Sequence, residues 1–307
     1  MELRDAVQSA DPPQSGPGMA DLFAAFTITR WEGGHRAAFA ADENAAGGRP
    51  FLDSVEIDMA RGPREQMADL NLGRADIVQL GLGELPRLQN GRRLWTSAPV
   101  RVVALVFQPR VDDPRLREAL AFSIDRDAIH RVLLQRQGEI SGALLPQWLS
   151  GFAFLFPSTA DLNRARSLSG GVAAPARALT LAVDDPALRS IADRIVLNAR
   201  DAGLSLSIVP SGAPADVKLV EARITSSEPA RALASVAAAL GLPEPPRSET
   251  PESLYFAERS LLEGFRVIPL FHLPDVYLVG PRVKGPPGIT PLGEWHFANL
   301  WLESPRP

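Results

Sequence analysis

The chain has 307 residues, of which 45% are hydrophobic and 22% charged, a composition typical of a folded protein with room for two domains. The net charge of -4 and the lack of a Lys/Arg block argue against a nucleic-acid or polybasic membrane partner. The absence of cysteine excludes disulfides, thiolate nucleophiles and Cys-type zinc sites. No run reaches the roughly 18 apolar residues of a membrane span, and the first residues lack an export signal.

The N-terminal region begins with a segment that favours neither helix nor strand. Residues 1–18 include "DPPQSGPG" and are predicted to be a disordered leader or linker. Three β-prone runs follow, "LFAAFTITRW", "HRAAFAAD" and "SVEIDMA", separated by Gly-rich turns, and they predict three strands of a mixed sheet. "GPREQMADLNLG" then predicts a short helix that ends at Gly73, and "ADIVQL" a buried strand, which together indicate a β-α-β step.

The next region combines a buried strand with a strong helix start. "VRVVALVFQ" (100–108) is continuous, apolar and β-branched, which favours a buried strand. Asp112 or Asp113 can cap a helix at Pro114. Its inward face is predicted to contain Leu116, Ala119, Leu120, Ser123 and Ile124, with Arg115, Arg117 and Glu118 pointing away. The apolar phase then slips, so we expect a second helix capped by Asp125, with Ala128, Ile129, Val132 and Leu133 inward, ending at Gly138.

Most polar residues fit structural roles. Asp184 and Asp185 precede a Pro and are interpreted as caps, and "EPARALASVAAALG" predicts a helix ending at Gly241. The four histidines have no metal-binding spacing, so no metal and no cofactor is expected. "GEISG" (138–142) lacks the G-x-S-x-G spacing of a nucleophile elbow. Nothing in the sequence therefore points to an enzyme.

Residues 104–146, "ALVFQPRVDDPRLREALAFSIDRDAIHRVLLQRQGEISGALLP", resemble the most recognisable segment of the extracellular solute-binding proteins of family 5, the dipeptide- and oligopeptide-binding components of ABC importers. The order and spacing of the strand, the acidic helix start, the "IDR" step and the Pro exit all agree. Flanking passages resemble the family in the same order, including the W-x-x-G passage at Trp31 and "VIPLFHLPDVYLVGPRVKG" near the C-terminus. The resemblance covers about residues 20–303.

The resemblance implies a class II periplasmic-binding-protein-like fold, mixed α and β, with two lobes. Residues 19–98 plus 266–307 would form the remainder of the first lobe, and 99–265 the second lobe. Family members carry a long part before the strand that corresponds to "FTITRW", so we expect the first lobe to be incomplete. Peptide-binding relatives also place a Trp and an acidic residue between the segments that match 215–224 and 256–271. This chain has no Trp there, and the acidic role is not transferred to Glu228.

The function implied by the resemblance is non-catalytic capture of a peptide or other small solute in a cleft between two lobes, followed by delivery to an ABC permease. The aromatic run after "GALLP" suits apolar stacking, although the same side chains could instead cover core. The candidate ligand-binding residues are Gln147, Trp148, Phe152, Phe154 and Trp31. The alternative is a truncated, diverged domain that acts as a regulatory or protein-interaction module.

Two further expectations follow from the resemblance. The family implies a periplasmic or extracellular location, whereas the absence of a signal in this sequence would fit the cytoplasm. An incomplete sheet edge in the first lobe would also suit a partner strand, which suggests a homo-oligomer.

Overall fold

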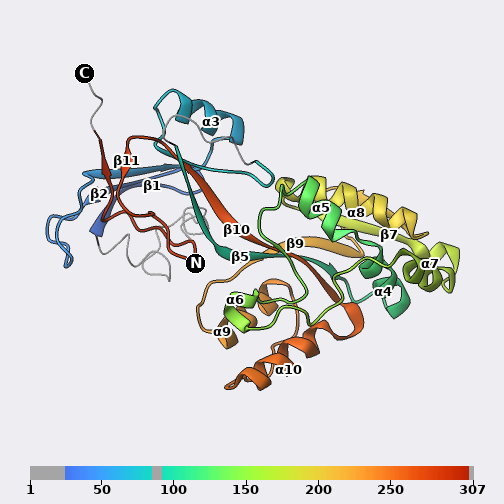
Figure 1. Ribbon diagram of the computed structural model, residues 1–307. Coiled ribbons are helices and arrows are strands. Elements are labelled where there is room, and N and C mark those ends of the chain that lie inside the picture. The colour runs from blue at the N-terminus through green and yellow to red at the C-terminus, as the bar shows by residue number, and fades with distance from the viewer. Residues whose placement is uncertain (1–24, 85–91, 304–307) are drawn as a thin grey trace. The chain divides into compact units, whose positions relative to one another are not determined.

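The computed structural model describes residues 25–84 and 92–303 (Figure 1). The predicted leader at 1–18 lies outside the described residues. The chain divides into two compact units, whose described parts fall within Met1–Gly81, Leu85–Ala98 and Pro274–Pro307 for the first unit, and within Leu82–Glu84 and Pro99–Leu273 for the second. Strands β5 (Arg93–Phe107) and β10 (Val267–Val279) each run from one unit into the other, so the chain changes units within these two strands.

The first unit contains a three-stranded sheet whose strands follow one another in order. They are β1 (Phe26–Glu32), β2 (Arg36–Ala41) and β3 (Ser54–Asp58). The three strands were predicted, but the mixed sheet was wrong because both pairs are antiparallel. The Gly33–Gly34 turn is too short for the crossover that a parallel pair requires. The core behind this sheet contains Phe26, Phe39, Trp95 and Phe297.

The remaining elements of the first unit are α3 (Pro63–Asn71), β4 (Ile77–Gln79), β11 (Val283–Lys284) and β12 (Trp301–Leu302). The helix was predicted, and Gly73 follows its end with φ of 68°. The β-α-β step was wrong. β4 pairs antiparallel with the end of β10, where Tyr277 lies opposite Gln79, whereas β3 belongs to the other sheet. Spacing along the chain gave the helix but not the strand's partner, which lies about 200 residues away.

The second unit is built on a mixed sheet. β9 (Val217–Arg223) pairs antiparallel with β5 and parallel with β7 (Ala178–Val183), which pairs parallel with β8 (Ser205–Val209). Its helices are α4 (Pro114–Ser123), α5 (Arg126–Val132), α6 (Gln147–Ser150), α7 (Leu162–Gly170), α8 (Arg189–Asp201), α9 (Pro229–Ala239) and α10 (Pro251–Leu262), with 3-10 turns at Ala174–Arg177, Pro186–Leu188 and Glu263–Phe265. Figure 1 shows α5 and α8 on one side of this sheet and α9 and α10 on the other.

Predicted caps account for where these helices begin. Asp113 accepts the N–H of Arg115 at the start of α4, and Asp125 accepts that of Ala128 at the start of α5. Asp185 caps the turn before α8. The predicted α9 ends at Ala239 and is followed by Gly241 with φ of 66°. Capping therefore fixes helix positions that apolar periodicity alone would leave loose.

The two linked helices were predicted, but three details differ. Arg117 is buried, because its guanidinium donates to the carbonyls of Val111, Asp112 and Gly264. Val132 is 66% exposed, and Leu134 is buried instead. α5 ends at Val132, six residues before Gly138, because Gln135 and Arg136 take positive φ. An arginine that bonds backbone carbonyls can occupy a core position that periodicity assigns to solvent.

Candidate functional site

The segment between β6 (Glu139–Ile140) and Phe156 carries four of the five candidate ligand residues. It forms a turn, then the short helix α6, which follows Pro146 and ends at Gly151 with φ of 79°. Gly142 packs so closely that a Cβ there would lie 3.0 Å from the carbonyl oxygens of Ala153 and Phe156. Leu155 and Phe156 both donate their N–H groups to Gly142 at 2.8 Å. The turn and the chain after α6 are therefore held together by backbone contacts.

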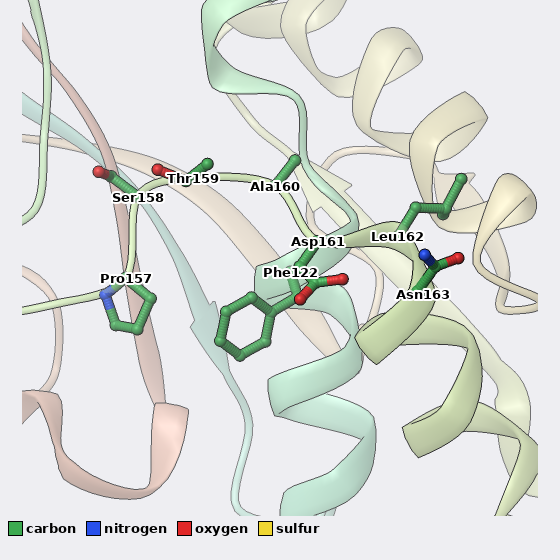
Figure 2. Close-up of a pocket in the computed structure, with 8 residues that line it drawn as sticks. All are labelled: Phe122, Pro157, Ser158, Thr159, Ala160, Asp161, Leu162 and Asn163. Atoms are coloured by element: carbon green, nitrogen blue, oxygen red, sulfur yellow. The ribbon is translucent and has the colours of Figure 1, made fainter.

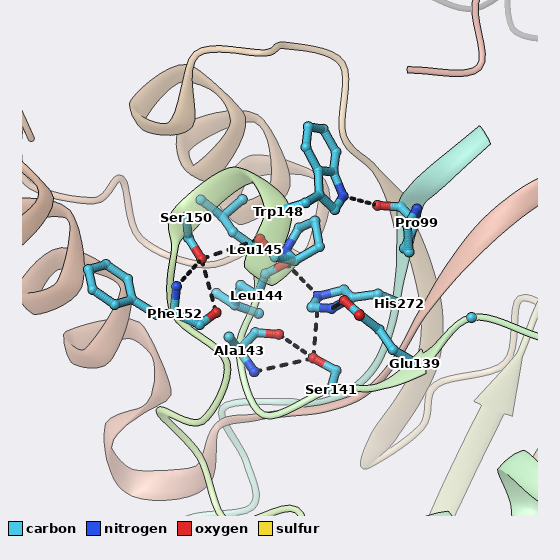
Figure 3. Close-up of polar contacts among 12 residues, drawn as sticks. Pro99, Glu139, Ser141, Ala143, Leu144, Leu145, Trp148, Ser150, Phe152 and His272 are labelled. Atoms are coloured by element: carbon cyan, nitrogen blue, oxygen red, sulfur yellow. Dashed lines mark hydrogen bonds and ion pairs between the residues drawn. The ribbon is translucent and has the colours of Figure 1, made fainter. Parts of the chain in front are cut away.

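Trp148 is the most distinctive side chain of this segment. Its indole Nε1 donates to the carbonyl oxygen of Pro99 at 3.0 Å, while 42% of the residue remains exposed (Figure 3). Pro99 lies in β5, at the first residue of the second unit. The hydrogen bond fixes the orientation of the ring, and the exposed area leaves it available for stacking. Gln147, one residue earlier, is also exposed.

The two phenylalanines of the segment differ in burial. Phe152 is half-buried and meets Tyr255 of α10 edge-on, with ring centroids 5.3 Å apart. Phe154 is 77% exposed. The expectation that these aromatics cover core therefore fits Phe152 but not Phe154. Trp31 belongs to the first unit, in β1, where it packs half-buried against that unit's core.

Two buried ionisable side chains that sequence reasoning missed bind the turn before α6. Glu258 of α10 is fully buried, and its Oε1 accepts the N–H groups of Leu144 and Leu145 at 2.6 and 2.8 Å. Burial raises the pKa of Glu258 to about 7, although these two hydrogen bonds act in the opposite direction. His272 of β10 is also buried, and its Nε2 lies 3.2 Å from the carbonyl oxygen of Leu144.

His272 also contacts Ser141 and Glu139, an arrangement that resembles a Ser-His-acid triad (Figure 3). Nε2 is 3.3 Å from Ser141 Oγ, and Nδ1 is 3.3 Å from Glu139 Oε1. A nucleophilic serine gives its proton to the histidine, whereas Ser141 donates to the carbonyl of Ala143. Leu144 O requires the proton to stay on Nε2. Ser141 is also only 1% exposed, and the three residues together stabilise the turn.

A pocket of about 570 Å³ lies elsewhere in the second unit, lined by Phe122 and residues 157–163 (Figure 2). Its side chains come mainly from one loop that leads into α7, and Asp161 is already engaged as the cap of that helix. Ser158 contributes its carbonyl oxygen to the buried guanidinium of Arg126 at 3.2 Å. None of the five candidate ligand residues lines this pocket.

Among residues 25–84 and 92–303, no group of three or more His, Cys, Asp or Glu side chains is placed to hold a metal ion. Within the same ranges, no helix has both the length and the apolar character to cross a membrane.

Several solved structures are similar to this chain in fold. A dipeptide-binding protein from Pseudoalteromonas sp. SM9913, in complex with Met-Leu, has a TM-score of 0.73 and 14% identity, with 91% of this chain and 64% of that chain covered. A peptide-binding protein AppA from Clostridium difficile has a TM-score of 0.69 and 16% identity, with 91% and 67% covered. NikA from Staphylococcus aureus, in complex with Ni(L-His)2, has a TM-score of 0.73 and 12% identity, with 91% and 68% covered.

These likenesses show the class II periplasmic-binding-protein-like fold, and this chain spans about two thirds of the length of the proteins it matches. No curated protein matches the sequence. The sequence model described as bacterial extracellular solute-binding proteins, family 5 Middle, matches residues 20–233. The match covers more than half of the chain. It includes the turn before α6, α6 itself and the starts of α4 and α5. The chain therefore belongs to the family 5 bacterial extracellular solute-binding proteins.

Proposed function

We propose that this chain is the solute-binding component of an ABC importer and that it binds a peptide or another small solute without changing it chemically. Family membership supports solute binding. Peptides are the first ligand class to test, because similar folds hold Met-Leu and, in AppA from Bacillus subtilis, a nonapeptide. Nickel-histidine complexes are the second, because NikA and NikZ hold them.

The observation that carries the proposal is the state of Trp148. A large apolar ring that is exposed, yet fixed by one hydrogen bond to Pro99, loses little conformational freedom when a ligand stacks on it. Gln147 can supply donors and acceptors beside the ring, and Phe154 offers a second exposed aromatic surface. Phe152 supports the same segment through Tyr255. We retain Trp31 as a ligand contact of the first unit.

We further propose that the two lobes of the family correspond to residues 19–98 plus 266–307 and to residues 99–265. The compact units change over at Ala98–Pro99 and at Leu273–Pro274, close to those bounds. A permease of the ABC type would be the partner, and the periplasm or the cell exterior the location, as for the family. Homo-oligomerisation has no support among the described residues and is not part of the proposal.

A thermal-shift screen tests the function directly. The purified chain would be melted with di- to nonapeptides, amino acids, sugars and Ni(L-His)2. A ligand at about one hundred times its Kd stabilises by about 2.7 kcal/mol, which raises Tm by about 2 to 4 °C in a protein of this size. We expect a hit among the peptides. A cooperative melt that no compound shifts would contradict solute binding and would favour the interaction-module alternative.

A further inference from the structure

The backbone N–H and the carbonyl oxygen of Leu144 are each bound by an ionisable side chain. The N–H donates to Oε1 of Glu258 at 2.6 Å, and the carbonyl oxygen lies 3.2 Å from Nε2 of His272. Leu145 adds a second N–H to the same carboxyl oxygen at 2.8 Å. Glu258 comes from α10 and His272 from β10, so the turn 141–145 is clamped between two elements that lie far from it in the sequence.

The turn leads directly into α6. Pro146 follows Leu145 and precedes the first helical residue, Gln147, and Trp148 comes next. Pro146 restricts the chain at this step because its φ is fixed near −68°. The turn and Trp148 are therefore joined by a short segment in which the φ of Pro146 cannot vary.

The carboxyl of Glu258 is bound through only one of its two oxygens. Its Oε2 is buried and has no hydrogen-bond partner among the described residues. Burial outweighs the two N–H bonds and brings its pKa to about 7, and no charged side chain contributes to that value. The other ionisable groups on α10 are Glu252, Tyr255 and Arg259, and the 3-10 turn that follows adds Glu263. Arg231 lies on α9, which packs against α10, and Glu139 and His272 lie across the turn 141–145.

We propose that Glu258 and His272 are positioning residues for the ligand-binding segment: together they hold the turn that presents Trp148, and loss of the proton from Glu258 releases that turn. This inference rests on the proposed function for its biological meaning, but the clamp itself can be tested without a ligand.

The direction of the effect follows from proton linkage. In the closed turn Glu258 keeps its proton up to about pH 7, whereas in an open turn the carboxyl meets water and titrates near its ordinary value of 4.5. Between these two values the open turn gains about tenfold in population per pH unit. Below that window the clamp is at its strongest, and above about pH 7 no further loss occurs, because the carboxyl is then ionised in both states.

Amide hydrogen exchange at Leu144 and Leu145 tests the clamp directly. After correction for the intrinsic exchange rate, we expect the protection of these two amides to fall about fortyfold between pH 5 and pH 7. Glu258→Gln keeps an acceptor for both N–H groups and cannot ionise, so its protection should stay constant over this range. Glu252→Gln, at an exposed position of the same helix, is the matched control and should behave as the wild type.

Equal pH dependence in the wild type and in Glu258→Gln would overturn the inference, as would constant protection in the wild type. Should Glu258→Gln fail to fold, the carboxyl 13C resonance of Glu258 in the wild type decides the matter. An inflection near pH 7 supports the clamp, and one near pH 4.5 overturns it.

The dipeptide Met-Leu serves as the binding probe, because it stays intact over this pH range. It should bind more weakly at pH 7 than at pH 5, and Glu258→Gln should remove that difference. Trp148→Ala separates the two proposals, because it tests ligand contact while leaving the three contacts of the clamp in place. If amide protection at Leu144 and Leu145 does not change with pH in the wild type, the clamp is refuted. If Trp148→Ala leaves the affinity for the probe unchanged, the binding site is refuted.

Discussion

Two buried ionisable side chains of the second unit, Arg126 and Glu258, meet backbone groups in opposite ways. The guanidinium of Arg126 donates to the carbonyl oxygens of Pro269, Ala121 and Ser158, and burial lowers its pKa to about 10. The carboxyl of Glu258 accepts two N–H groups through one oxygen only, and burial raises its pKa to about 7.

Both shifts have the same cause, since desolvation disfavours the charged form of either group. The consequences differ because the two groups have different ordinary pKa values. Arg126 remains charged at neutral pH and acts as a permanent link between three segments. Glu258 reaches the physiological range, so the same physical effect makes its link conditional on pH.

The largest loss of stability is expected when the side chain of Arg126 is replaced. Arg126→Met keeps much of the buried volume but removes a donor from three carbonyl oxygens, and it should lower the free energy of unfolding by about 4 kcal/mol. Urea denaturation measures this. Arg131→Met, at an exposed position of the same helix, should change stability by less than about 0.5 kcal/mol. Equal losses in the free energy of unfolding for the two variants would show that Arg126 does not link the three segments.

The conditional link should appear as a pH dependence of stability. The folded-state pKa of Glu258 is raised from 4.5 to about 7, so its contribution is complete below pH 4.5 and lost as the pH rises to about 7. The wild type should therefore lose about 3 kcal/mol relative to Glu258→Gln across this interval. Denaturation of both proteins at a series of pH values gives this difference. If the free energy of unfolding has the same pH dependence in both, the raised pKa does not belong to Glu258.

Asp113 is a less buried carboxylate that, like Glu258, accepts a backbone N–H. Asp113 accepts the N–H of Arg115, and hydrogen bonding by the Arg115 side chain lowers the pKa of Asp113, the reverse of Glu258. Its contribution is present at neutral pH and is lost on acidification through the lowered pKa. Asp113→Ala should cost about 1 kcal/mol at pH 7. Asp112→Ala is the control, and an equal cost would show that Asp113 does not act as the cap.

The smallest expected effect on stability comes from the ligand-binding segment. Trp148→Phe retains an aromatic ring and removes the indole hydrogen bond to Pro99, so it should cost about 0.5 to 1 kcal/mol. Ligand affinity should fall further than stability, because the ring is no longer fixed. Calorimetric melts with and without a bound peptide separate these two quantities, and a change in stability alone would argue that Trp148 is structural.

Local signals in the sequence predicted much of the fold. Asp and Pro at helix starts and continuous apolar runs placed α4, α5 and β5, and the family pattern gave the overall architecture. Strand partners were not predictable from local spacing, as the antiparallel first sheet and the position of β4 show. Periodicity also failed at Arg117, because it treats a charged residue as exposed whatever backbone acceptors surround it.

The candidate site was only partly accessible to the same reasoning. An aromatic run after a Pro directed attention to Trp148 and its neighbours, which remain predictions. The clamp could not have been found in this way, because Glu258 lies 114 residues from Leu144 and His272 lies 128 residues from it. The glycines of "GEISG" were a usable signal, since a Cβ at Gly138 would lie 2.2 Å from the carbonyl oxygen of His272.

The proposed role of Trp148 is to bind the solute with its exposed ring. Isothermal titration at pH 5 with the compound that gives the largest thermal shift tests this role, using the wild type, Trp148→Ala and Glu252→Gln. We expect Trp148→Ala to weaken binding at least tenfold, while Glu252→Gln binds as the wild type does. Equal affinity of all three proteins would contradict it and would place the ligand elsewhere on the chain.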